Sequence, residues 1–449
     1  MRRCGCRVTP PRREQRTAGP PATSRRGDHR TSHGDEVVVE RVGAALVVHA
    51  AGTDDPALRA LAAALPATPA PIVVDAAGVP DAALFGRLAS AVTAAVDEGT
   101  RTFRVVGRDL PRVDPGWWRR LADRTGAELL VPSGRVTVAG ATLFVHGADE
   151  GSAGTWWRCA PGVPAVLLGA RHPVPSWQAA VPEELPTVHG LLATQHLPGG
   201  VLLRPATTAL DTRWRVVPAD PDHLTVIAGV PGGPHVRAAD VASYLGSIPE
   251  KARATARLAC GTGQDVVALG CDTAEFLGSG VTVVDGTPVV RENGIEFVFH
   301  DLSGAATWTP YLQEIHCLTG ATTAVPRRWR APRPDLAPYL PGAFRVTDRW
   351  LLVVMRSGLW LRQVSRPWHP VPVGRSVNPA VKVIAVGDPG ESLPDDVWPL
   401  VSDLLDDFAP SALRRVRLSV LGVPSRRGRA VLEELTGRGR GGLRASVPT

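Results

Sequence analysis

Short runs of β-branched and other apolar residues recur along the chain, and each is followed by a glycine-containing loop and a longer amphipathic stretch. The most apolar runs are PIVVDA at residue 71, LTVIAG at 224 and VKVIAV at 381. Continuous apolar runs of this length are typical of strands buried on both faces. Apolar residues recur at intervals of three and four in the following stretches, which predicts helices lying on a sheet. These predicted helices cover 80–99, 236–252 and 393–408.

A second apolar strand follows each predicted helix, and a hairpin-like pattern precedes each unit. The second strands are FRVVG, ARLACG and VRLSVLG, and the hairpins are predicted at 36–52, 201–217 and 343–363. Strands that alternate with helices of this length imply right-handed crossovers. Each unit is therefore expected to form a mainly parallel sheet whose faces are covered by helices.

The units repeat with a period of about 150 residues, which is the size of a domain. Landmark residues recur at nearly the same interval: Gly134 and Gly286, His146 and His300, Trp156 and Trp308, and Trp177 and Trp329. The predicted fold is α/β, with three related βαβαβ modules that carry β-hairpin additions and a third copy that is truncated. The predicted boundaries are a disordered basic tail at 1–36, repeat 1 at 37–190, repeat 2 at 191–342 and repeat 3 at 343–449.

Composition agrees with several globular domains, because 44% of the 449 residues are apolar and 21% are charged. No apolar run approaches the roughly 18 residues that a membrane span needs, and the first 36 residues lack the apolar core of a secretory signal. The net charge of +7 comes from arginine-rich ends, while the body is mildly acidic. We expect solvated basic ends and no binding of nucleic acid. Of 50 basic residues only Lys251 and Lys382 are lysines.

The sequence lacks the common catalytic and metal-binding signatures. It has no Walker P-loop, no H-E-x-x-H and no G-x-S-x-G motif. Its six cysteines are too few and too irregularly spaced for a disulfide framework, which predicts a reduced, cytoplasmic protein. Cys4 and Cys6 form a C-x-C pair without a second pair at zinc spacing, so no metal site is expected. No cofactor is expected either.

The stretch RLACGTGQDVVALGCDTAEFLGSGVTVVDG, at 257–286, reads as a strand, a glycine loop, a helix and a strand. It resembles the S-adenosylmethionine site of class I methyltransferases. The resemblance implies that Gly261 and Gly263 line the cofactor and that Asp285 binds the ribose hydroxyls. The sequence departs from the family at Arg257, where that family has an acidic residue, and repeat 1 has proline and aspartate in place of the glycine loop.

The stretch LADRTGAELLVPSGRV, at 121–136, looks like modules of actinobacterial proteins associated with polymorphic toxins and caspase-like domains. In that family a histidine activates a nucleophilic cysteine. The matching cysteine here is Cys260, but Ala228 and Gly229 stand where the family has His-Gly, and the nearest histidine is His235. This resemblance implies a degenerate caspase-like cysteine hydrolase from an actinobacterium.

The leading interpretation is a non-catalytic, repeat-built α/β protein that acts as a binding or scaffold protein toward other proteins. The polar residues are not reproduced at the strand ends of the copies, although α/β proteins normally form their sites there. A methyltransferase using repeat 2 and the caspase-like hydrolase remain alternatives. His146 and His300 are expected to share a packing or hydrogen-bonding role. The oligomeric state is left open.

Overall fold

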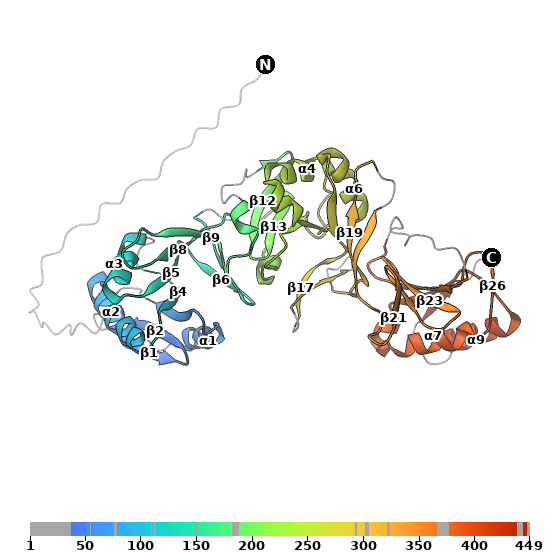
Figure 1. Cartoon of the computed structure of the whole chain (residues 1–449), viewed down its shortest axis with the longest axis horizontal. Helices are drawn as coiled ribbons and strands as arrows, with labels where there is room; N and C mark the ends of the chain where they lie inside the picture. The colour runs from blue at the N-terminus through green and yellow to red at the C-terminus, as the bar shows by residue number, and fades with distance from the viewer. Residues whose placement is uncertain are drawn as a thin grey trace, which may run out of the picture.

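The three apolar runs become central strands of three separate sheets, because a strand buried on both faces needs apolar side chains on both sides. The computed structural model describes residues 37–446 except 54, 76–78, 109, 111–113, 149–150, 182–187, 292–293, 301–304, 321–323, 366–376 and 438–442. The three α/β modules lie in a row along the molecule (Figure 1). The predicted basic tail at 1–36, with Cys4 and Cys6, lies outside the described residues.

The first module is built around the run at residue 71. Its strands are β1 (Val37–Val42), β2 (Ala45–Ala50), β3 (Ala70–Asp75), β4 (Thr102–Arg108), β5 (Glu128–Pro132), β6 (Val136–Ala139), β7 (Thr142–Val145), β8 (Trp156–Cys159), β9 (Val166–Gly169) and β10 (Arg171–His172). Its helices are α1 (Pro56–Ala64), α2 (Asp81–Asp97) and α3 (Pro115–Thr125), and the short 3-10 helix η1 (Gln178–Ala180) follows.

The second module is built around the run at residue 224. Its strands are β11 (Val188–His189), β12 (Leu192–Leu197), β13 (Gly200–Pro205), β14 (Thr225–Ala228), β15 (Arg257–Cys260), β16 (Val281–Val284), β17 (Thr287–Arg291), β18 (Gly294–Val298), β19 (Leu312–Cys317) and β20 (Val325–Trp329). Its helices are η2 (Arg213–Val216), α4 (Ala238–Ser247), α5 (Glu250–Ala254) and α6 (Val266–Leu277).

The third module is built around the run at residue 381. Its strands are β21 (Ala337–Leu340), β22 (Ala343–Arg345), β23 (Trp350–Met355), β24 (Gly358–Gln363), β25 (Lys382–Val386), β26 (Ser392–Leu393), β27 (Val416–Val420), β28 (Val423–Pro424) and β29 (Arg444–Ser446). Its helices are α7 (Val397–Asp406), α8 (Pro410–Leu413) and α9 (Arg426–Gly437). The third copy was predicted to be truncated, and among the described residues its last strand is β29, which is parallel to β27.

The three sheets share one strand order. The orders are β1-β2-β3-β4-β5-β8-β9, then β11-β12-β13-β14-β15-β16-β19-β20, then β21-β22-β23-β24-β25-β27-β29. Each sheet contains four neighbouring parallel strands. Antiparallel pairs flank them on both sides in the first two sheets and on one side in the third, where β29 is the edge strand. The predicted α/β fold, with three related modules and hairpin additions, is therefore present. Each sheet combines a block of parallel strands with antiparallel strands and is therefore mixed as a whole.

The register places an arginine at the same point of the second central strand in every module. Pro71 pairs with Arg104, Thr225 with Arg257, and Val383 with Arg417. The local signals that end the helices also recur. α3 and α6 each begin after an aspartate whose side chain accepts backbone N–H groups, and each ends at a glycine in the left-handed conformation.

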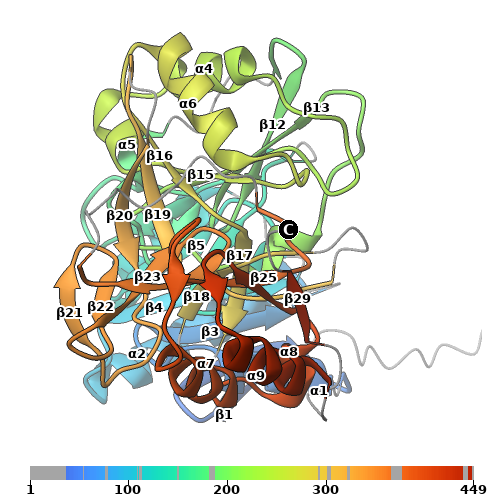
Figure 2. The same cartoon turned by 90° about the vertical axis from the view of Figure 1, so that its right-hand side faces the viewer.

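Apolar side chains on the helices and sheets form the cores. In the first module α2 and α3 cover one face of the sheet and α1 covers the other. In the second module α4 and α6 cover one face, whereas η2 and the β17–β18 hairpin cover the other. Figure 2 shows α7 and α9 side by side beneath the third sheet. The cores of the second and third modules join into one continuous cluster of buried residues.

One predicted element is wrong. The hairpin predicted at 201–217 is formed instead by β12 and β13, so that Gly200–Pro205 is its second strand. The alternating pattern at 213–217 does not make a strand, because Trp214 is buried against the second face of the sheet from the 3-10 helix η2. Among the described residues, no helix has the length and apolar character that crossing a membrane requires.

Candidate functional site

Each sheet has an amino edge, where its central parallel strands begin, and a carboxyl edge, where they end. α/β proteins bind ligands at the carboxyl edge, so the predicted site residues were expected there. In the second module this edge follows Ala228, Cys260 and Val284. Cys260, Gly261, Gly263 and Asp285 all lie at this edge, and His235 lies in the loop between β14 and α4.

The glycine loop has a packing role that the structure shows directly. A Cβ atom at Gly261 would collide with the carbonyl oxygen of Gly229, because the loops after β14 and β15 pass close to each other. Gly263 has a φ of +82°, which favours glycine. Backbone packing and conformation thus account for glycine at both positions without a bound ligand.

The contact that the structure shows for the Cys260 thiol is with a threonine hydroxyl. The Cys260 Sγ lies 3.2 Å from the Thr262 hydroxyl oxygen, and the residue is partly buried. Burial raises the pKa of the Cys260 thiol, although the hydrogen bond to Thr262 acts in the opposite direction. His235 is exposed. A thiol with a raised pKa holds little of the reactive thiolate at neutral pH.

Asp285 is held by the third module. Its side chain is 1% exposed, and its two oxygens accept hydrogen bonds from Arg356 Nε at 2.9 Å and Arg356 Nη2 at 2.8 Å. Arg356 lies in the turn between β23 and β24 and is itself buried. A ribose could reach the Asp285 carboxylate only by displacing this guanidinium.

Arg356 bridges two carboxylates of the second module. Asp265 caps α6 by accepting the N–H groups of Val267 and Ala268, and it also accepts from Arg356 at 3.0 and 3.2 Å. Burial by itself would lower the pKa of Arg356, but its hydrogen bonds and charge interactions with Asp285 and Asp265 outweigh burial and raise it above the usual value. The guanidinium therefore stays charged.

A lysine in an aromatic cage forms the second part of the same junction. The Lys382 ammonium lies 5.3 Å from the ring centroid of Trp308, 4.8 Å from that of Tyr311 and 5.0 Å from that of Phe408. Burial, and then the charge of Arg330, lower the pKa of Lys382 to about 8. Cation–π contacts of this kind favour the charged amine.

Hydrogen bonds from side chains to backbone carbonyls complete the junction between the second and third modules. Arg415 donates to the carbonyl oxygens of Ala306 and Thr307, at 3.1 Å in both cases. The Thr307 hydroxyl donates to the carbonyl of Pro379 at 2.6 Å. Arg356, Lys382 and Arg415 all belong to the amino edge of the third module. The carboxyl edge of the second module is therefore covered by the module that follows it.

The first and second modules meet in the same direction. Arg171, at the carboxyl-edge side of the first module, donates to the carbonyl oxygens of Leu197, Pro198 and Gly200 at 2.7, 2.8 and 2.9 Å. These carbonyls belong to the turn between β12 and β13, which lies at the amino edge of the second module and matches the turn that carries Arg356.

Further bonds hold this first junction. The Thr142 hydroxyl accepts the N–H of Ala219, and Trp177 Nε1 donates to the carbonyl of Asp220. Ala219 and Asp220 lie in the segment before β14, at the amino edge of the second module. Both junctions thus join a carboxyl edge to the amino edge of the next module.

Of the three arginines that share one position in the second central strand, Arg104 and Arg257 contact residues of their own module. Arg257 pairs with Asp220 and Glu314, with 2.8 Å between nitrogen and oxygen in each pair. Arg104 is 1% exposed and donates to the carbonyl of Pro66 at 3.0 Å. Arg417 is exposed. The arginine that replaces the methyltransferase acid therefore anchors the segment leading into β14.

His146 and His300 share a hydrogen-bonding role. His146 Nε2 lies 2.7 Å from the Thr137 hydroxyl, and His300 Nδ1 lies 2.8 Å from the Thr287 hydroxyl. Each threonine belongs to the partner strand of the same hairpin.

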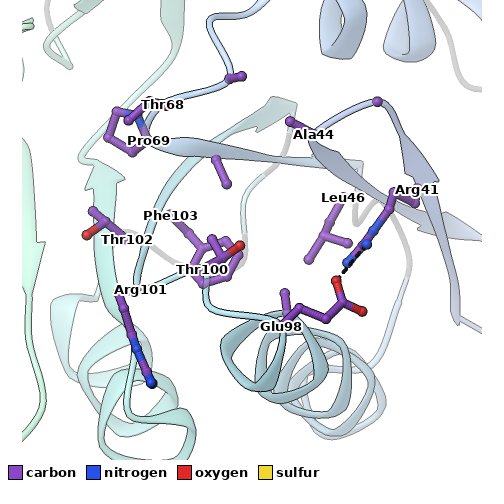
Figure 3. A pocket seen from close by; sticks show the side chains of 14 residues that line it. Arg41, Ala44, Leu46, Thr68, Pro69, Glu98, Thr100, Arg101, Thr102 and Phe103 are labelled. Carbon is purple, nitrogen blue, oxygen red and sulfur yellow. Dashed lines mark ion pairs between the residues drawn. The ribbon is translucent and has the colours of Figure 1, made fainter.

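A pocket with a volume of about 510 Å³ lies at the amino edge of the first module (Figure 3). The turn between β1 and β2, the segment before β3 and the segment before β4 surround it. Arg41 and Glu98 form an exposed ion pair of 2.7 Å beside it. Arg101 extends from the segment before β4.

Sequence reasoning placed the glycine loop and Asp285 at one edge but missed Arg356, Arg171 and the cage around Lys382. The rarity of lysine was the one available signal, since Lys382 is one of only two. Among the described residues, no group of three or more His, Cys, Asp or Glu side chains has a metal-binding arrangement. No protein-family model matches the chain, and no curated protein matches it.

Proposed function

We propose that the protein is a non-catalytic scaffold or binding protein, and that its α/β modules use their sheet edges to recognise protein surfaces. The observation that carries this proposal is the ion pair between Arg356 and Asp285. In the second module, the edge where an α/β enzyme binds its ligand contacts a neighbouring module instead.

The energetics of the junction support this use. A buried carboxylate that loses its partner costs about 3 to 5 kcal/mol, so opening this edge for a cofactor is unfavourable. The continuous core of the second and third modules adds apolar burial that would also be lost. A rigid row of modules presents its surfaces at fixed spacing, which suits a scaffold.

The environment of the cysteines supports a cytoplasmic location as part of the proposal. The described cysteines are free thiols: Cys159, Cys260, Cys271 and Cys317. Unpaired cysteines of this kind are usual in a reducing compartment.

Calorimetric titration of the full chain with S-adenosylhomocysteine tests the proposal. We expect no heat of binding at millimolar ligand, because Arg356 occupies the Asp285 carboxylate. Asp272→Ala is a matched control, since Asp272 is exposed on α6 in the same module. Micromolar binding that Asp285→Ala abolishes and Asp272→Ala preserves would establish the methyltransferase alternative and overturn the scaffold proposal.

A further inference from the structure

The two junctions within the chain have one polarity. At each of them the amino edge of a module, including the turn of its leading hairpin, packs against the carboxyl edge of the module before it. An interface of this kind uses two different surfaces, so each module carries one half of a junction on either side. Among the described residues, the amino edge of the first module and the carboxyl edge of the third are the halves that no other module contacts.

The amino edge of the first module is exposed where its counterparts are buried. Pro198 and Arg356 occupy the leading turns of the second and third modules and are buried. The register places Gly43 at the same point of the β1–β2 turn, and Gly43 and its neighbour Ala44 are both exposed. The pocket of Figure 3 is the hollow between this turn and the segments that precede β3 and β4.

The carboxyl edge of the third module is also exposed. The segments after β25 and β27 form it, and Val423, in the short strand β28 of the second segment, is 56% exposed. The first segment, the loop at 387–396, contains four acidic residues and no basic residue: Asp388, Glu391, Asp395 and Asp396. Within the module, Arg362 pairs with Asp388 and Arg349 pairs with Asp396. The edge therefore offers an apolar side chain beside a loop whose negative charge is partly balanced by these arginines.

The charges of the two free edges match the polarity of an existing junction. Between the second and third modules, an arginine of the amino edge binds two carboxylates of the carboxyl edge. Two arginines and one acid line the free amino edge: Glu98 pairs with Arg41, so that Arg101 supplies the charge opposite in sign to the acidic loop of the third module. Complementary charges of this kind set orientation and favour encounter.

From this repeated polarity we infer that the pocketed amino edge of the first module binds the carboxyl edge of the third module of a second copy of this chain. The inference rests on the proposed scaffold function, because it uses the same edge-to-edge recognition between chains. Such head-to-tail contacts do not close on themselves as a two-fold dimer does. They produce rings or open rows of chains.

Sedimentation velocity of the full chain across a concentration series tests the inference, with two charge variants at opposite ends. Arg101→Glu places an acid on the amino edge, and Val423→Arg places a base on the carboxyl edge. Each change is expected to weaken self-association by about tenfold or more, because like charges then meet at the interface. Arg158→Glu is the control, since it makes the same charge change at an exposed site on β8, away from both edges.

Mixing the variants gives the decisive readout. Arg101→Glu keeps an intact carboxyl edge and Val423→Arg keeps an intact amino edge, so their mixture should associate while each alone does not. Circular dichroism confirms that both variants are folded. The milder Arg101→Ala replaces Arg101→Glu, and the milder Val423→Ala replaces Val423→Arg, where the first choice is not folded.

Two results would overturn the inference: a wild-type chain that stays monomeric throughout, or association that the mixture fails to restore. Neither result touches the scaffold proposal, which the titration with S-adenosylhomocysteine tests separately.

Discussion

Replacing Arg356 with methionine keeps an aliphatic side chain of similar length in the turn between β23 and β24 but removes the guanidinium. The hydrogen bonds that are lost include two to Asp285 and two to Asp265. Asp285 is 1% exposed, so its charge is left in the interior. We expect the free energy of unfolding at pH 7 to fall by about 3 to 5 kcal/mol. Asp265, whose side chain is 26% exposed, adds little because water can reach it.

The loss should depend on pH. Burial raises the pKa of Asp285, and Arg356 lowers it, so the variant leaves the raising effect unopposed. A carboxyl group whose folded pKa is raised stabilises the fold only below its unfolded pKa of about 3.9, and that stability is lost as the pH rises through the folded value. The difference between wild type and Arg356→Met should therefore shrink on acidification from pH 7 toward pH 4.

Urea denaturation followed by circular dichroism measures these differences. Adding Asp285→Asn to the variant should recover part of the stability, because the buried charge is then removed. Arg349→Met is a matched control in the same module, since Arg349 and its partner Asp396 are about half exposed, and it should cost less than about 1 kcal/mol. An Arg356→Met variant as stable as that control would refute the argument that this ion pair holds the two modules.

Three further predictions follow from the same contacts. Cys260 should react with iodoacetamide at neutral pH no faster than a free thiol, because burial raises its pKa. His235→Ala should leave the rate of labelling unchanged. Fast labelling that this variant slows would favour the cysteine hydrolase alternative. Lys382 has a pKa lowered to about 8, so its contribution to the free energy of unfolding should rise with pH between about 8 and the unfolded pKa of about 10.4. Urea denaturation of Lys382→Met should show no such rise. Arg171→Met leaves buried carbonyls of the β12–β13 turn unpaired and should cost about 2 kcal/mol or more; unchanged cleavage near 197–200 in limited proteolysis would contradict this.

The fold could be predicted to the level of modules because its signals are local. The runs that became β3, β14 and β25 are apolar except for one polar residue at an end of each strand. The aspartate before α6 and the glycine after it lie next to the helix in sequence. The failure at 213–217 has the opposite cause. There a strand-like pattern is overridden by tertiary packing, since Trp214 fills the second face of the sheet.

The site could be predicted only in part, because its partners are distant in sequence. Asp285 was placed at the end of β16 correctly, but nothing near it indicates an arginine 71 residues further along the chain. The same holds for Lys382, whose cage combines Trp308 and Tyr311 with Phe408. A local motif shows which side chains lie at the end of a strand. Which residues bind those side chains depends on how the modules pack against each other.

The spacing between Asp285 and Arg356 also matters during synthesis on the ribosome. The second module emerges with its carboxylate in place, while the arginine that neutralises it is 71 residues behind. At about 5 to 20 residues per second, the nascent chain passes several seconds with that edge unsatisfied. The turn to which Arg171 donates hydrogen bonds follows after only 26 to 29 residues. The junction between the first and second modules can therefore form much sooner. Slow translation of the third module would therefore lengthen the period in which the second is open to proteases and to pairing with other nascent chains.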